Sequence, residues 1–218
     1  MRIVIKGDKG EQAIFEEVLA MRLRWLGLDL VLIAFIFCAF YAAAAQDAKE
    51  RVIRRLPIEQ NEPIAITDIK VNGKSVSLDK KFNADDEWLR GLAVSIENKS
   101  EKRILLASIQ LQFHHPPGSK DPMSVDDIFY GNWALQTRPP TSEEQLVGIA
   151  PSETVEIRLS SQQYVDLRNF LTGTGFAQSI ERVDMRIDRV IFEDDAMWSG
   201  GSYLRRAQND PGSWKVSP

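Results

Sequence analysis

Apolar and polar residues alternate along most of the chain after residue 63, with the period of two that is typical of half-buried β-strands. The clearest such segments are 92–96 and 105–113. In the second segment, one side of the strand carries Leu105, Ala107, Ile109, Leu111 and Phe113. Because Ser108, Gln110 and Gln112 fall on the other side, we predict an antiparallel strand with one buried face and one solvated face.

The opening of this alternating region contains a strong turn signal. Asn72-Gly73 separates two runs of β-type residues, and both residues accept the positive φ angles of a type I′ turn. The sequence therefore predicts a β-hairpin centred on these two residues.

Later segments are shorter or less regular. Strands are predicted at 145–149 and 154–159, and the stretch 119–144 is expected to be a long loop with one short strand. Within 183–192 the alternation changes parity near Asp188, which predicts a β-bulge.

One segment has helical periodicity. Ser160 or Ser161 can cap a helix over 161–171, and the glycines at 173 and 175 can end it. No strand–helix–strand repetition is present. The pattern predicts an all-β fold: an antiparallel two-layer sandwich, immunoglobulin-like in the loose sense, with one short helix near 161–171 and an N-terminal hydrophobic helix.

The N-terminal hydrophobic helix is expected from Trp25 to Ala45. Residues 30–45 carry no charge, but this core is shorter than the ~20 apolar residues that a membrane span needs. Arg22 and Arg24 precede the segment and small residues end it, which favours a signal peptide cut after Ala44 or Ala45. The predicted division is 1–20 as an extension or mis-called start, 21–45 as signal peptide or membrane anchor, 46–62 as polar tether and 63–218 as β-sandwich domain.

The alternative for this segment is an uncleaved anchor. Four basic residues within 49–55 follow the apolar run closely and outnumber Arg22, Arg24 and Lys9 before it, which argues against export of the C-terminal side. We expect the protein to be exported, periplasmic or extracellular, or anchored to the inner membrane through Trp25 to Ala45.

Composition limits the classes of function. The net charge is −4, which gives no electrostatic reason to expect nucleic acid as a partner. The one cysteine, Cys38, lies in the apolar segment. The sequence has no G-x-S-x-G motif and no nucleotide-binding glycine pattern. We therefore predict a protein that is not an enzyme and has no cofactor.

Two groups of residues are candidate metal ligands. Asp194 and Asp195 could supply oxygen atoms to calcium if their loop meets others, although they lack D-x-D-x-D spacing. His114 and His115 are the only histidines, and adjacent residues of a strand point to opposite faces. They leave a metal-dependent hydrolase as a weaker alternative.

The C-terminal region mixes aromatic and cationic side chains, the combination enriched at binding hot spots. These candidate binding residues are Trp198, Tyr203, Arg205, Arg206 and Trp214. The structural alternative is that the aromatic rings seal an edge of the sandwich while the arginines pair with Asp194, Asp195 or Asp210.

Residues 190–214, VIFEDDAMWSGGSYLRRAQNDPGSW, contain an F-x-D-x-x-x-W core followed by glycines and an arginine pair. This stretch resembles the tails of uncharacterised exported bacterial β-sandwich proteins. The resemblance implies export and a sandwich fold, and it brings no activity with it. Together these observations predict an exported, non-catalytic module that binds a protein or surface polymer in the cell envelope, or a membrane-anchored accessory subunit with the sandwich projecting outside.

Overall fold

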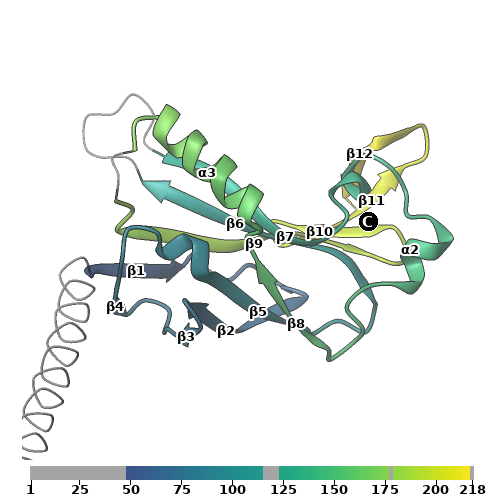
Figure 1. The fold of residues 1–218 in the computed structure, drawn as a ribbon. Helices are drawn as coiled ribbons and strands as arrows, with labels where there is room; N and C mark the ends of the chain where they lie inside the picture. Colours follow the sequence, from purple (N-terminus) through teal and green to yellow (C-terminus); the bar gives the residue numbers. More distant parts are fainter. Residues whose placement is uncertain (1–47, 115–122, 177–178, 217–218) are drawn as a thin grey trace, which may run out of the picture. The chain divides into compact units, whose positions relative to one another are not determined.

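The computed structural model describes residues 48–114, 123–176 and 179–216 (Figure 1). The predicted extension 1–20, the hydrophobic segment 21–45 and His115 lie outside the described residues. Within the described part of the chain, no helix combines the length and apolarity needed to cross a membrane.

Strands dominate the unit Ala48–Pro218, and they form two sheets. The strands are β1 (Lys49–Arg55), β2 (Ile64–Val71), β3 (Lys74–Ser75), β4 (Lys81–Ala84), β5 (Leu92–Asn98), β6 (Ile104–His114), β7 (Met123–Gly131), β8 (Thr154–Arg158), β9 (Arg182–Phe192), β10 (Ala196–Ser199), β11 (Ser202–Ala207) and β12 (Asp210–Val216). Sheet A has the order β12-β11-β10-β9-β1-β4, with β6 pairing with β9 and β7 pairing with β6. Sheet B has the order β3-β2-β5-β8.

Most of the buried apolar side chains form a main core, and a second, smaller cluster includes Leu106 and Ile191. The two sheets and the low helix content confirm the predicted all-β sandwich. Val94 and Ile96 of β5 face Ile109, Leu111 and Phe113 of β6 within the main core, and all five side chains are fully buried. Burying such side chains is the main source of stability for a fold of this kind, at about 1.5–3 kcal/mol each.

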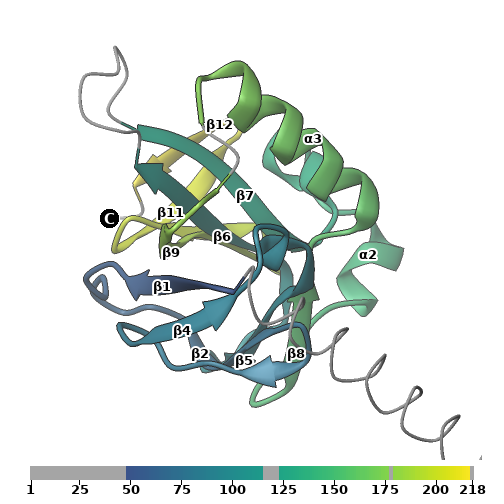
Figure 2. The same cartoon turned by 60° about the vertical axis from the view of Figure 1, so that its left-hand side comes forward.

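Helix α3 (Ser161–Gly173) covers the part of the core beside β6 and β7 (Figures 1 and 2). The Ser160 hydroxyl accepts a hydrogen bond from the Gln163 amide, as the predicted cap requires. The inward-facing residues of the helix are Tyr164, Leu167 and Leu171. The prediction of a helix near 161–171 is confirmed.

The predicted hairpin at Asn72-Gly73 joins β2 to β3. Asn72 has φ 51° and Gly73 has φ 77°, the positive pair that a type I′ turn needs. Val71 pairs with Lys74 across the turn, so the loop has two residues.

The assignment of 46–62 to a polar tether does not hold for its middle. Residues Lys49–Arg55 form β1, which pairs with β4 and with β9. Arg51 and Ile53 are buried there, and Arg51 makes buried hydrogen bonds that its sequence pattern does not reveal. The pairing of β1 with β9 is parallel, so sheet A is mixed and the purely antiparallel prediction is wrong at this one place.

The region 119–149 also differs from the prediction. Within it, β7 has nine residues and pairs along most of β6. Two short helical segments follow, η2 (Trp133–Gln136) and α2 (Ser142–Leu146), where α2 replaces the start of the strand predicted at 145–149. Thr141 and Glu144 form a capping box that starts α2, and this local signal outweighs the short apolar run.

A bulge interrupts the pairing of β9 with β6 where parity changes in the sequence. Ser108 pairs with Arg189 and Ile109 with Ile187, so Asp188 is the additional residue. The bulge therefore lies where it was predicted, and it re-aims the second half of β9.

Candidate functional site

Trp198, the first predicted binding residue, is part of the core. Its side chain is 0% exposed, and its indole Nε1 donates to the Gln60 carbonyl over 3.2 Å. This indole offers no surface to a partner and instead fixes the loop that precedes β2.

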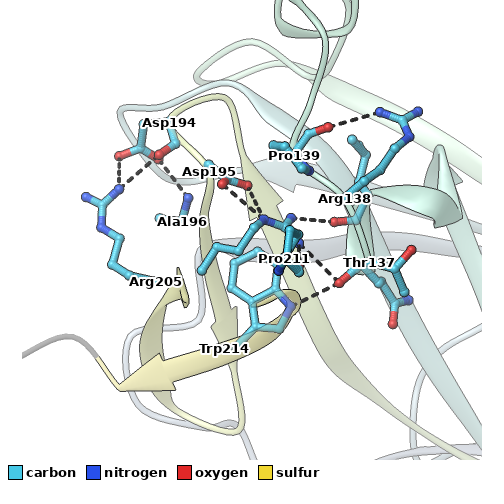
Figure 3. Close-up of polar contacts among 12 residues, drawn as sticks. Thr137, Arg138, Pro139, Asp194, Asp195, Ala196, Arg205, Pro211 and Trp214 are labelled. Atoms are coloured by element: carbon cyan, nitrogen blue, oxygen red, sulfur yellow. Dashed lines mark hydrogen bonds and ion pairs between the residues drawn. The ribbon is translucent and has the colours of Figure 1, made fainter. Parts of the chain in front are cut away.

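Arg206 and Trp214 hold the β11–β12 hairpin against η2. Figure 3 shows the Trp214 indole among these contacts. The Arg206 guanidinium lies 4.1 Å from the Trp214 ring centroid and donates to Asp195 Oδ1 over 3.0 Å and to the Leu135 carbonyl over 2.7 Å. The Trp214 indole donates to the Gln136 carbonyl over 3.1 Å. Only 6% of the Arg206 side chain is exposed, so these contacts match the structural alternative for the C-terminal residues.

Arg205 and Asp194 form a second ion pair in this region (Figure 3). Their closest charged atoms are 3.2 Å apart, and Lys102 donates to Asp194 over 2.8 Å. Burial raises the pKa of Asp194, but the Lys102 hydrogen bond and the two cations outweigh burial and hold the pKa below its usual value. Asp194 and Asp195 thus both have cationic partners. Among the described residues, no group of three or more His, Cys, Asp and Glu side chains could hold a metal ion.

Tyr203 is the most exposed ring of the predicted set, at 39%, and it stacks on Phe192 with ring centroids 6.1 Å apart. An open depression of about 600 Å³ lies along the same hairpin, lined by Arg205, Asp210 and Lys215 among others. The lining of this open depression mixes both charge signs, so it selects no ligand class.

A second polar surface lies on sheet A, on the side of β6 that faces away from the core. We define this outer face by Ser108, Gln110, Gln112 and His114 of β6 with their neighbours on β7, β9 and β1. Contrary to the prediction of a solvated face, Ser108 is 0% and Gln112 8% exposed. The outer face is therefore an ordered layer of polar groups.

Asp184 of β9 organises one end of the outer face. It is 2% exposed, and its Oδ2 lies 2.7 Å from His114 Nε2, while its Oδ1 accepts from Arg182 Nε over 2.6 Å. Arg182 also donates through a terminal nitrogen to Oδ2, which makes the pair bidentate. Burial raises the pKa of Asp184, but the hydrogen bonds from Arg182 and His114 hold it below its usual value.

The cationic groups around Asp184 are partly exposed to solvent. His114 is 41% and Arg182 37% exposed at the side chain. Arg54 pairs with Asp184 across the β1–β9 ladder, is exposed, and has no side-chain hydrogen bond or ion pair within the described residues. We call Arg54, His114 and Arg182 the cationic cluster.

The far end of the outer face carries aromatic and acidic groups. Trp133 of η2 is 37% exposed, with its ring 5.0 Å from Phe129 and 5.4 Å from the Arg189 guanidinium. Asp127 lies nearby, and burial together with the Asp188 charge raises its pKa to about 6. Its Oδ1 makes no hydrogen bond within the described residues.

Sequence reasoning missed the cationic cluster. Asp184 and His114 are 70 positions apart, and they meet only because Gln112 pairs with Asp184 in the β6–β9 ladder. The one available signal was a histidine at the end of a predicted strand, and that signal does not identify its partner. Comparison of this chain with protein-family models, with curated proteins and with solved structures found no match.

Proposed function

We propose that this chain is an exported, non-catalytic β-sandwich module that binds an acidic group of a cell-envelope polymer through the cationic cluster. The observation that carries the proposal is the Asp184 carboxylate, which is buried and holds His114 and Arg182 in fixed positions. A rigidly held donor pair loses little side-chain freedom when a ligand binds, and this lowers the free-energy cost of binding.

The chemistry of the cluster suits an anion. Arg182 is ion-paired with the Asp184 carboxylate, and Arg54 is the register partner of Asp184 on β1, so the two guanidinium groups outnumber the one carboxylate even with His114 neutral. Guanidinium groups bind carboxylates and phosphates with paired hydrogen bonds. Because the chain as a whole is net acidic, at −4, a locally positive cluster is a place where an anion meets less repulsion.

The test is titration of the full chain with sodium sulfate and with inorganic phosphate at constant ionic strength, followed by NMR shifts of backbone amides. Arg54→Ala removes an exposed group whose side chain makes no hydrogen bond or ion pair within the described residues, so the fold should remain intact. We expect it to weaken anion binding about tenfold, in line with about 1.4 kcal/mol for a charged hydrogen bond.

Arg90→Ala is the matched control. Arg90 is also an exposed arginine without a side-chain hydrogen bond in the described part of the chain, and it lies in η1 (Trp88–Gly91) rather than on the outer face. Its removal should change the dissociation constant of the anion by less than about twofold. Equal losses from both variants, or no shifts at β6 and β9, would reject the cationic cluster as the binding site.

A further inference from the structure

The polar layer of the outer face continues from the cationic cluster along β6. Gln112 donates to Gln110 over 2.9 Å, and Arg186 donates to the same Gln110 oxygen over 3.1 Å. His114 and Ser108 are six residues apart on this strand, which corresponds to about 20 Å. The outer face thus offers a long strip of ordered amides and guanidinium groups.

The two ends of this strip differ in charge. At one end, Arg54, His114 and Arg182 favour an anion. At the other end, the Asp188 charge lies close enough to raise the pKa of the Asp127 carboxyl, and Arg189, which is ion-paired with Asp188, lowers it in part. Carboxylates accept hydrogen bonds from hydroxyl groups, so this end favours neutral, hydroxyl-bearing groups over acidic ones.

Trp133 adds an apolar surface at the end of the outer face that carries Asp127 and Asp188. Phe129 packs on the ring at 5.0 Å and Arg189 at 5.4 Å, and these contacts keep the partly exposed indole in place. A fixed, flat ring beside hydrogen-bonding groups suits a ligand with an apolar face and polar edges, which is the character of a sugar ring.

The arrangement of β6 disfavours an extended peptide as the ligand. β6 pairs with β7 on one side and with β9 on the other, so its backbone groups are used within the sheet. A peptide that adds a strand needs an unpaired edge. Recognition on the outer face must therefore come from side chains, which present both donors and acceptors.

We propose that the outer face binds an acidic polysaccharide laid along β6, with a sugar carboxylate at Arg54, His114 and Arg182 and a sugar ring on Trp133. This inference rests on the proposed function, since it uses the same cationic cluster. It goes further by assigning the ligand to one class and by adding Trp133 as a binding residue.

The test is calorimetry of the full chain with three probes: an oligogalacturonate long enough to span the strip, a neutral malto-oligosaccharide of similar length, and poly-glutamate of similar charge. We expect the oligogalacturonate to bind at least about tenfold more tightly than either of the others. Trp133→Ala should weaken oligogalacturonate binding about tenfold and leave sulfate binding unchanged. Trp133→Phe should retain most of the affinity, which separates loss of the ring from loss of folding.

Tyr203→Ala is the control, because Tyr203 has a similarly exposed ring, at 39%, away from the outer face. It should leave oligogalacturonate binding unchanged. If poly-glutamate binds as tightly as oligogalacturonate, or if Trp133→Ala has no effect, the polysaccharide assignment fails while the anion site stands. If sulfate and phosphate also fail to bind, the proposed function fails with it.

Discussion

The Arg51 guanidinium donates a 2.5 Å hydrogen bond to the Asp86 carboxylate and thereby joins β1 to the segment between β4 and η1. The same guanidinium donates to the Ile180 carbonyl over 3.0 Å and to the Ser179 hydroxyl over 2.7 Å. The Arg51 side chain is 0% exposed, whereas Asp86 is 37% exposed. One buried cation therefore connects three segments that are distant in the sequence.

Replacing Arg51 should destabilise the domain. Arg51→Ala leaves a cavity and a buried Ile180 carbonyl without this donor, so we expect a loss of about 3 kcal/mol in the free energy of unfolding. Urea denaturation followed by tryptophan fluorescence measures the loss. Arg54→Ala, on the same strand but exposed, should change the free energy by less than about 0.5 kcal/mol. Similar effects from the two variants would contradict the role assigned to Arg51.

The position of β1 in sheet A also predicts where the folded domain begins. A chain of residues 46–218, the product of the predicted cleavage, keeps β1 whole and should fold. A chain of residues 63–218, the domain boundary predicted from sequence, lacks buried Arg51 and Ile53 and exposes the edge of β9. It should aggregate or lack dispersed amide signals in an NMR spectrum. A well-folded 63–218 fragment would show that β1 is dispensable.

Local patterns explain which parts of the fold could be predicted. The alternation in β5 and β6 and the turn at Asn72-Gly73 are determined by neighbours in sequence, and these elements were predicted correctly. β1 was missed because its sequence, KERVIRR, is mostly charged, and burial of Arg51 depends on partners more than thirty positions away. The local pattern of polar and apolar residues cannot predict such a contact.

The same reasoning applies to the candidate sites. Aromatic and cationic residues near the C-terminus attract attention in the sequence, but Trp198 and Arg206 are used by the fold itself. The cationic cluster has no motif, because Arg54, His114 and Arg182 come from three strands and meet through the pairings of β9. Only the register of the sheet brings them together.

The Asp184 carboxylate should make stability depend on acid pH. Its pKa in the folded protein lies below the value of about 3.9 for an unfolded chain, so its contribution is fully present above that value. The contribution is lost as pH falls through the folded pKa. We expect wild type to exceed Asp184→Asn by about 2 kcal/mol at pH 7, with the gap closing as pH falls below 4. Unfolding free energies measured from pH 7 to pH 3 test this; a constant gap would contradict it.

The Asp127 carboxylate should make the stability of the domain depend on pH in the opposite direction. Burial, the largest cause, and the Asp188 charge raise its folded pKa to about 6, above the unfolded value. The folded state therefore binds a proton more tightly than the unfolded state does, and ionisation of Asp127 costs stability as pH rises from about 4 to about 6. Above that pH range Asp127 is ionised in both the folded and the unfolded state, so the loss of stability no longer grows with pH.

Asp127→Asn should consequently stabilise the protein at pH 8 by on the order of 1 kcal/mol, a value reduced for the partial exposure of the group. The gain should shrink as pH falls from 6 to 4, because wild-type Asp127 is then protonated. Chemical denaturation at pH 8, 6 and 4 measures the gain, with Glu101→Gln as the control because Glu101 is exposed in a turn. A loss of stability at pH 8 would instead mean that the ionised carboxylate is held by a favourable partner, and the assignment of this end of the outer face to hydroxyl groups would need revision.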